Sequence, residues 1–147
     1  MLSAKGKYAL KALGYLATLE PLASAQSSDI AAANAIPKKF LNVILGELRK
    51  ASIVQSRKGP GGGYRLARPA REISIGYVIR IIDGPLAPIA CASRTAHQPC
   101  RDCKDVRNCT VRLMMTNVRD AISDVLDRVT LAEMVALGQH RARKRRA

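Results

Sequence analysis

The sequence has few aromatic and few acidic residues. Among its 147 residues there are four tyrosines, one phenylalanine and no tryptophan, which argues against nucleic-acid binding by stacking of bases on aromatic side chains. Eleven Asp and Glu stand against 25 Lys and Arg, so the formal net charge is +14. This excess of cations indicates a polyanionic partner. The alternative is a basic protein whose charge serves only its solubility.

The sequence also lacks the patterns of common catalytic sites and of membrane-spanning segments. Its two histidines, His97 and His140, are far apart, and residues 61–63 are not followed by the Gly-Lys-Ser/Thr of a phosphate-binding loop. No apolar run approaches the ~20 residues that span a bilayer, and residues 1–7 lack the apolar core of a signal peptide. We therefore expect a cytoplasmic protein that is not an enzyme and has no membrane partner.

Helical periodicity predicts three helices in the first fifty residues, at 5–20, at about 28–34 and at 37–50. Residues 27–29 (Ser-Ser-Asp) offer oxygens that cap the second helix. Pro37 suits the first turn of the third helix, where its missing N–H is no loss. A short helix, a tight turn and a longer helix in this order are typical of a helix-turn-helix.

The predicted helix at 37–50 has two chemically different sides. Its apolar side is formed by Phe40, Leu41, Ile44, Leu45 and Leu48, and its polar side by Lys38, Lys39, Asn42, Gly46, Arg49 and Lys50. Asparagine can pair with adenine in the major groove, and lysine can reach guanine or phosphate. A lone helix of this kind is more often a solvated surface helix. The short helix before it and the hairpin after it favour a recognition helix, with Lys38, Lys39, Asn42 and Arg49 as DNA contacts.

Residues 56–66 read Ser-Arg-Lys-Gly-Pro-Gly-Gly-Gly-Tyr-Arg-Leu, which predicts a glycine-rich β-hairpin loop between strands at 53–56 and 64–66. Glycine permits positive φ and a close approach to another surface. The candidate DNA contacts here are Ser56, Arg57, Lys58, Gly59 and Arg65. The fold class is therefore mainly α with a small β-wing, a winged helix-turn-helix whose wing contacts the DNA backbone or minor groove.

The second half of the chain predicts a fourth helix at about 75–83, a loop, and a long helix over about 105–128. On the long helix Val111, Met114, Val118, Ala121, Val125 and Val129 recur at steps of three or four residues. A stripe this regular outside a small domain favours packing against a second copy of the chain; the alternative is packing on the winged domain.

These patterns divide the chain into four parts. Residues 1–83 form the winged helix-turn-helix DNA-binding domain and 84–104 a cysteine-rich sensor loop. Residues 105–136 hold the dimerisation helix and the segment after it, and 137–147 form a basic tail. A charge run of this kind is usually solvated and disordered, and can add non-specific affinity for phosphates.

Four cysteines, Cys91, Cys100, Cys103 and Cys109, fall within nineteen residues. Thiolates are ligands for soft and borderline metals, and four of them can complete an iron–sulfur cluster or a tetrahedral zinc site. The alternative is a set of free thiols without a metal. His97 lies in the same loop and can replace one ligand, although a solvated loop histidine is the commoner case.

Four segments of the sequence resemble the Rrf2 family of bacterial winged-helix regulators, whose members include IscR, NsrR, RirA and CymR. They are residues 5–10, 36–50, 56–66 and 130–134, and the hairpin pattern is the most specific of them. The resemblance implies a homodimer of winged helices joined by a long antiparallel dimerisation helix, with a cluster-binding loop before that helix.

The resemblance also bears on the cysteines. Several family members bind a 2Fe-2S or 4Fe-4S cluster through three cysteines, to which Cys91, Cys103 and Cys109 are similar, and this leaves Cys100 as a candidate fourth ligand. IscR-like members use a histidine where this chain has Arg112, and some nitric-oxide sensors use an acidic residue where it has Lys7. CymR-like members bind no cluster and sense through a partner protein.

Together the residues and the resemblance predict a sequence-specific, homodimeric regulator of transcription that binds double-stranded DNA. We expect it to sense iron, redox state or nitric oxide through a cysteine-ligated iron–sulfur cluster. The alternative is the same DNA-binding fold with zinc, or with cluster-free sensing by thiols or by a regulatory protein partner.

Overall fold

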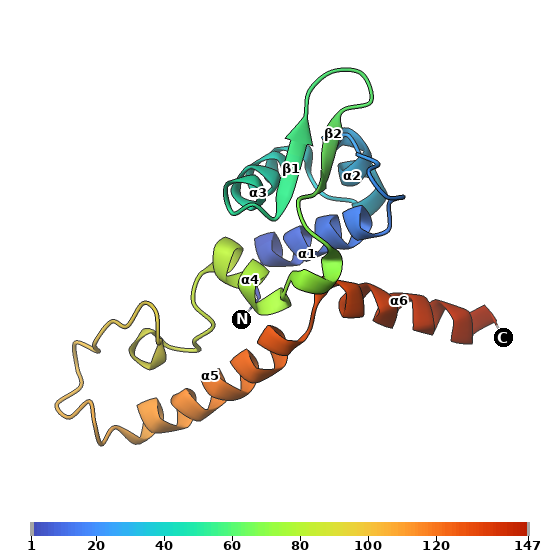
Figure 1. Cartoon of the computed structure of the whole chain (residues 1–147). Helices are drawn as coiled ribbons and strands as arrows, with labels where there is room; N and C mark the ends of the chain where they lie inside the picture. The colour runs from blue at the N-terminus through green and yellow to red at the C-terminus, as the bar shows by residue number, and fades with distance from the viewer. Residues whose placement is uncertain (1, 147) are drawn as a thin grey trace.

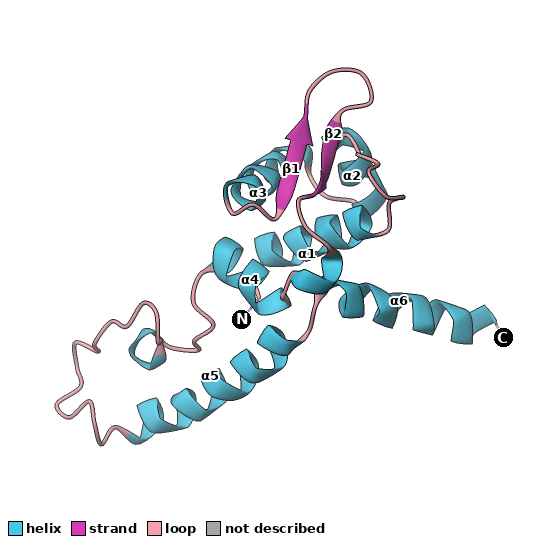
Figure 2. Cartoon of the chain, viewed as in Figure 1, coloured by secondary structure: helices cyan, strands magenta, loops and turns pink. Residues whose placement is uncertain are grey.

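The computed structural model describes residues 2–146, which form six α-helices, one two-stranded sheet and two short 3-10 helices (Figures 1 and 2). The elements in chain order are α1 (Ala4–Ala17), α2 (Ser27–Asn34), α3 (Lys38–Lys50), β1 (Val54–Arg57), β2 (Gly63–Leu66), η1 (Ala70–Glu72), α4 (Ile75–Asp83), η2 (Ala90–Ala92), α5 (Thr110–Arg128) and α6 (Leu131–Arg146). The mainly α fold with a small β-hairpin is confirmed. Met1 and Ala147, the ends of the first and last predicted parts, lie outside the described residues.

The core lies between α1, α3 and α4. Apolar residues of α3 meet α1 because Leu41, Ile44, Leu45 and Leu48 share one helix face, and all four are fully buried. Phe40 was predicted on the same side, but 55% of it is exposed. It lies about 100° around the helix from Leu41, so only the edge of its ring meets another aromatic, Tyr8, at a centroid distance of 6.4 Å.

The turn between α2 and α3 is made by a left-handed residue. Ala35 has φ 51°, and the N–H of Ile36 bonds back to the carbonyl of Ala31 over 3.0 Å, which ends α2. The predicted side-chain cap at 27–29 is wrong. Ser27 already begins the helix, and Gln26 precedes it without a side-chain capping bond, so these three residues occupy the first turn instead.

The hairpin pairs β1 with β2 in an antiparallel register from Val54 opposite Leu66 to Arg57 opposite Gly63. Tyr64 and Ala25 exchange both backbone hydrogen bonds, at 2.9 and 2.8 Å, so the hairpin is also fixed to the segment before α2. Gly63 permits this approach: its φ is +129°, and a Cβ there would lie 2.4 Å from the carbonyl oxygen of Ala25.

The long helix α5 projects away from the winged body, and the cysteine segment folds beside it (Figure 1). It begins at Thr110, five residues later than the predicted start at 105. The carboxylate of Asp105 accepts hydrogen bonds from the N–H groups of Arg107 and Asn108, at 3.0 and 3.2 Å. Such a side-chain turn competes with the first helical turn and delays it.

The basic tail is helical and not disordered, since α6 runs to Arg146. Thr130 and Glu133 cap its start reciprocally: the carboxylate accepts from the Thr130 N–H at 2.7 Å, and the Glu133 N–H donates to the threonine hydroxyl at 3.2 Å. Leu131 is fully buried and fixes this end to the core. The rest of the helix is rich in Ala and Arg, which favour helix. Among the described residues, no helix is long and apolar enough to cross a membrane.

Candidate DNA interface and cysteine segment

The polar side of α3 is open to solvent. Lys38, Lys39, Asn42 and Arg49 are all exposed, whereas the opposite side of the helix is buried. The predicted division of the helix into two sides is therefore present, except at Phe40. Sequence reasoning missed Val43, an apolar residue on the polar side that is 56% exposed. Helical spacing could have revealed it, because Val43 lies three residues before Gly46 and therefore on the same side of the helix.

The wing residues Ser56, Arg57, Lys58 and Gly59 are also exposed. Arg49 at the end of α3 donates from Nη1 to the hydroxyl of Ser56 over 3.4 Å, so helix and hairpin are in direct contact. Arg65 differs from the others: it is half-buried, and its Nη1 donates to the carbonyl oxygen of Leu22 over 3.4 Å. Eight of the nine predicted contact residues on α3 and the wing are therefore exposed, and Arg65 is the exception.

The surface formed by α3 and the hairpin is positively charged and contains one acidic residue. Between Lys38 and Leu66 the sole acid is Glu47, and Lys5 of α1 holds it in an ion pair at 2.7 Å, with a third of each side chain exposed. The pair cancels a negative charge that would repel a phosphate. The helix and wing can therefore face a polyanion along their whole length.

The four cysteines are free thiols that lie as two pairs. Cys91 is buried in η2 and hydrogen-bonds with the exposed Cys100, which raises the pKa of Cys100. Desolvation and a hydrogen bond with Cys109 raise the pKa of Cys103. Within residues 2–146 no three His, Cys, Asp or Glu side chains converge as a metal-binding group, and His97 is an exposed loop residue.

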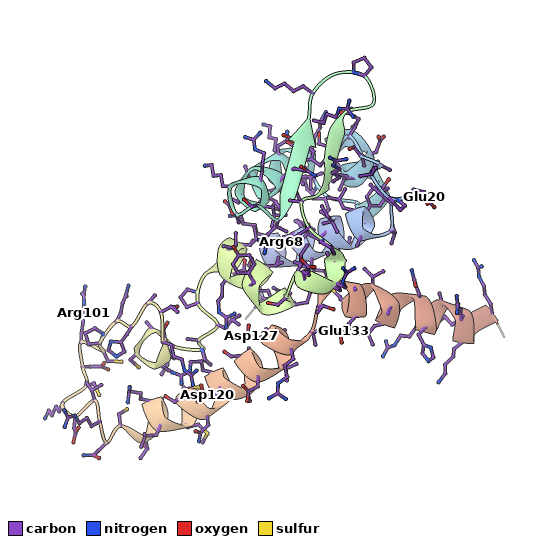
Figure 3. All side chains as sticks on the ribbon, in the orientation of Figure 1. Glu20, Arg68, Arg101, Asp120, Asp127 and Glu133 are labelled. Carbon is purple, nitrogen blue, oxygen red and sulfur yellow. The ribbon has the colours of Figure 1, made fainter. Side chains whose placement is uncertain are left out.

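The donor set still suits a soft metal or a cluster, because thiolates are the ligands that such centres require. Cys109 stands just before α5, where the backbone N–H of Arg112 lowers the pKa of its thiol and so favours the thiolate. The outer part of the loop, with Arg101 at its edge in Figure 3, is exposed from Arg94 to Asp102.

Two arginines of α5 fix the inner end of the cysteine segment. Arg112 donates from Nε to the carbonyl oxygen of Cys91 over 3.0 Å, and Arg119 donates to the carbonyl oxygen of Ala92. Arg119 also pairs with Asp120 at 2.6 Å, and Asp120 accepts from Arg94 at 2.9 Å. These contacts join η2 to α5, which lie side by side in Figure 1.

A second set of contacts joins α5 to the winged body. Arg80 of α4 pairs with Asp127 of α5, with one of the two bonds at 2.9 Å. The pair raises the pKa of Arg80 and lowers that of Asp127. Gly76 lets the helices approach, since a Cβ there would lie 2.1 Å from the Asp127 carboxylate. The helix α5 is thus in contact both with the cysteine segment and with α4 of the winged body.

The apolar stripe of α5 is uncovered in the single chain. No residue of α5 is buried, and Val111, Met114, Val118 and Val125 are 59%, 61%, 38% and 62% exposed. Ile122, exposed by 37%, continues the stripe, and Val129 after the helix packs on the core. The stripe from Val111 to Val125 is therefore not used for packing on the winged domain, which was the alternative interpretation of the sequence, whereas its last member, Val129, is.

Helix, turn, recognition helix and wing define a winged helix-turn-helix of the kind that transcriptional regulators use. The profile of the Rrf2 family, described as an iron-dependent transcriptional regulator, matches residues 2–137, and this chain belongs to the Rrf2 family. Its relatives and its fold are those of transcriptional regulators and not of enzymes.

Individual proteins agree with this assignment. A Rhodobacter capsulatus protein named as an rrf2-like HTH-type transcriptional regulator is 42% identical over 146 residues, covering 97% of each chain. IscR of Vibrio campbellii is 32% identical over 91% of this chain and 76% of its own. Among solved structures, CymR, the global cysteine regulator of B. subtilis, superposes with TM-score 0.75 at 28% identity, covering 93% of this chain and 97% of its own. IscR of T. potens gives TM-score 0.72 at 28% identity, over 94% and 88%.

Proposed function

We propose that this regulator binds one DNA sequence, with α3 in the major groove and the wing on the backbone or minor groove. The observation that carries the proposal is the joined cationic surface of α3 and the hairpin, whose sole acid is paired with Lys5. Lys38, Lys39, Asn42 and Arg49 supply the helix contacts, and Ser56, Arg57, Lys58, Gly59 and Arg65 those of the wing. Residues 1–83 are then the DNA-binding part.

Selection from a random double-stranded DNA library tests this proposal. The purified chain should enrich one short sequence and bind it in a salt-dependent manner, since phosphate contacts release counterions. If all sequences still bind equally after repeated rounds, the chain is a basic protein without sequence preference, and the proposal is contradicted.

We further propose that residues 105–136 form the dimerisation part, with the stripe of α5 packed against that of a second copy. A dimer reads two half-sites at a fixed spacing, which raises specificity without a new kind of contact. The support is the run of uncovered apolar residues from Val111 to Val125. Large apolar surfaces of this kind are rarely left in water.

For residues 84–104, together with Cys109 just before α5, we propose a sensor that holds an iron–sulfur cluster through Cys91, Cys103 and Cys109, with Cys100 as fourth ligand. When bound, such a cluster supplies reversible redox chemistry and reactivity toward oxygen and nitric oxide. Cys109 at the start of α5 and the Arg112 contact with Cys91 connect the ligands to the dimerisation helix. A change in the segment would bias α5 relative to the wings between two arrangements.

Anaerobic purification tests the sensor. The cluster predicts a coloured protein with iron and sulfide, and loss of colour when Cys91, Cys103 or Cys109 is replaced by alanine. The pairing of Cys91 with Cys100 and of Cys103 with Cys109 favours a second candidate, sensing by thiols without a cluster. A colourless protein with one zinc, or with no metal and peroxide-reactive thiols, would contradict the cluster and leave DNA binding untouched.

A further inference from the structure

The exposed side of α3 contains one apolar residue among polar ones. Lys39, Asn42, Val43 and Gly46 are spaced by three and four residues, so they are neighbours on the helix surface. Lys39 and Asn42 are exposed, and 56% of Val43 is exposed. Val43 lies in the first half of the helix, the part of a recognition helix that meets base edges.

No packing within the described chain accounts for Val43. It is absent from the core, and it borders an open hollow of about 280 Å³, whose lining is Lys5, Lys39, Phe40 and Val43. The surface of the hollow is almost wholly apolar, and of its two lysines Lys5 has its ammonium group paired with Glu47. An apolar contact next to the Lys39 side chain suits a ligand that carries both a methyl group and phosphates.

Gly46 adds a second observation on the same side of the helix. Glycine in a helix interior is less stable than alanine, yet Gly46 has ordinary helical φ, and a Cβ there would meet nothing within 4 Å. The fold does not need a glycine at this position. What Gly46 provides is free space beside Asn42 and Val43, into which another surface can move closely.

We propose that Val43 contacts the 5-methyl group of a thymine in the major groove, next to the base pair that Asn42 contacts, and that Gly46 makes room for the DNA there. The thymine methyl is the apolar group that base pairs display in the major groove. Lys39 beside it reaches phosphate or guanine, and the Lys5–Glu47 pair removes the repulsion of the one nearby acid. This inference rests on the proposed DNA binding and specifies one base, a thymine, that the recognition helix contacts.

The test uses the duplex enriched by selection, with each thymine replaced in turn by deoxyuridine, which lacks only the methyl group. At one position the replacement should weaken binding of the parent about fourfold, the effect of one buried methyl. Val43→Ala should bind the thymine and uracil duplexes equally. Leu137→Ala, which shortens an apolar residue of α6 that is 66% exposed, serves as the control and should keep the full discrimination.

Each outcome decides something different. If uracil has no effect at any position, or if Val43→Ala still discriminates, the inference is wrong while sequence-specific binding stands. If no duplex is enriched, the proposed function fails and the inference fails with it. Gly46→Ala should raise the thermal unfolding midpoint and weaken binding of the enriched duplex. Unchanged affinity would remove Gly46 from the interface.

Discussion

Arg112, in the first turn of α5, donates a hydrogen bond from Nε to the backbone carbonyl oxygen of Cys91 over 3.0 Å. By the family resemblance, Arg112 takes the position at which IscR-like members use a histidine ligand. A guanidinium stays protonated and has no acceptor atom, so it cannot be a metal ligand. Its contact gives it a positioning role instead, because it holds the buried Cys91 against α5.

Arg112→Ala should therefore release Cys91 and lower the amount of iron and sulfide that the anaerobic protein retains. Loss of one partly exposed hydrogen bond affects overall stability by about 1 kcal/mol, so the circular dichroism of the protein should change little. Arg107→Ala, on the exposed turn before α5, is the matched control. Equal cluster content in both variants would show that the Cys91 contact is dispensable.

Val118→Glu places a charge in the middle of the apolar stripe of α5. In a dimer this carboxylate would be desolvated without a partner, so sedimentation equilibrium should show a shift from dimer to monomer. Asn117→Glu adds the same charge about 100° around the helix, outside the stripe, and should stay dimeric. A parent chain that is monomeric at all concentrations, or a dimeric Val118→Glu, would contradict the role of the stripe.

Gly63→Ala should weaken the attachment of the wing to the body. Its φ of +129° is unfavourable for alanine, and the new Cβ would meet the backbone of Ala25 at 2.4 Å, so we expect a loss of about 1–3 kcal/mol in the free energy of unfolding. Gly61 has φ +70° and open space around it, so alanine there would have an unfavourable backbone conformation but no steric clash. A urea titration should rank Gly63→Ala as less stable than Gly61→Ala; the reverse order would be evidence against the described wing.

The Arg80–Asp127 pair predicts a pH dependence. Its hydrogen bond lowers the pKa of Asp127 in the folded state, so the pair stabilises the fold above the unfolded pKa of about 3.9, and the stabilisation is lost as pH falls through the folded value. Because 33% and 44% of the two side chains are exposed, the effect is below about 1 kcal/mol. Asp127→Asn should lose less stability than the parent between neutral pH and acid. Asp124→Asn, also on α5 and exposed, should follow the parent.

The sequence predicts those elements whose patterns are local. Helical spacing places Leu41, Ile44, Leu45 and Leu48 on one side of α3, and the glycine-rich segment gives the hairpin. Phe40 shows the limit of this reasoning, since a residue at the edge of an apolar face is buried only if a neighbouring element reaches it. The start of α5 was also missed, because a single Asp105 side chain forms a competing turn.

The candidate site was predictable where it consists of exposed side chains on one element, as on α3 and the wing. Contacts between distant segments were not. Periodicity carries no information on the pair of Lys5 with Glu47, the contact of Arg112 with Cys91, or the pairing of the cysteines. The helical state of the basic tail depends on the Thr130–Glu133 cap and on burial of Leu131. The number of charged residues in the tail predicts neither of these.

The account is tested most directly by comparing Asn42→Ala and Lys58→Ala on the enriched duplex and on mismatched duplexes over a range of salt. Asn42→Ala should lose preference for the base it contacts, by about 1–3 kcal/mol, with an unchanged salt slope. Lys58→Ala should weaken all duplexes alike and reduce the slope of log affinity against log salt by about one. Parent-like affinity, preference and slope in both variants would contradict DNA reading by α3 and the wing.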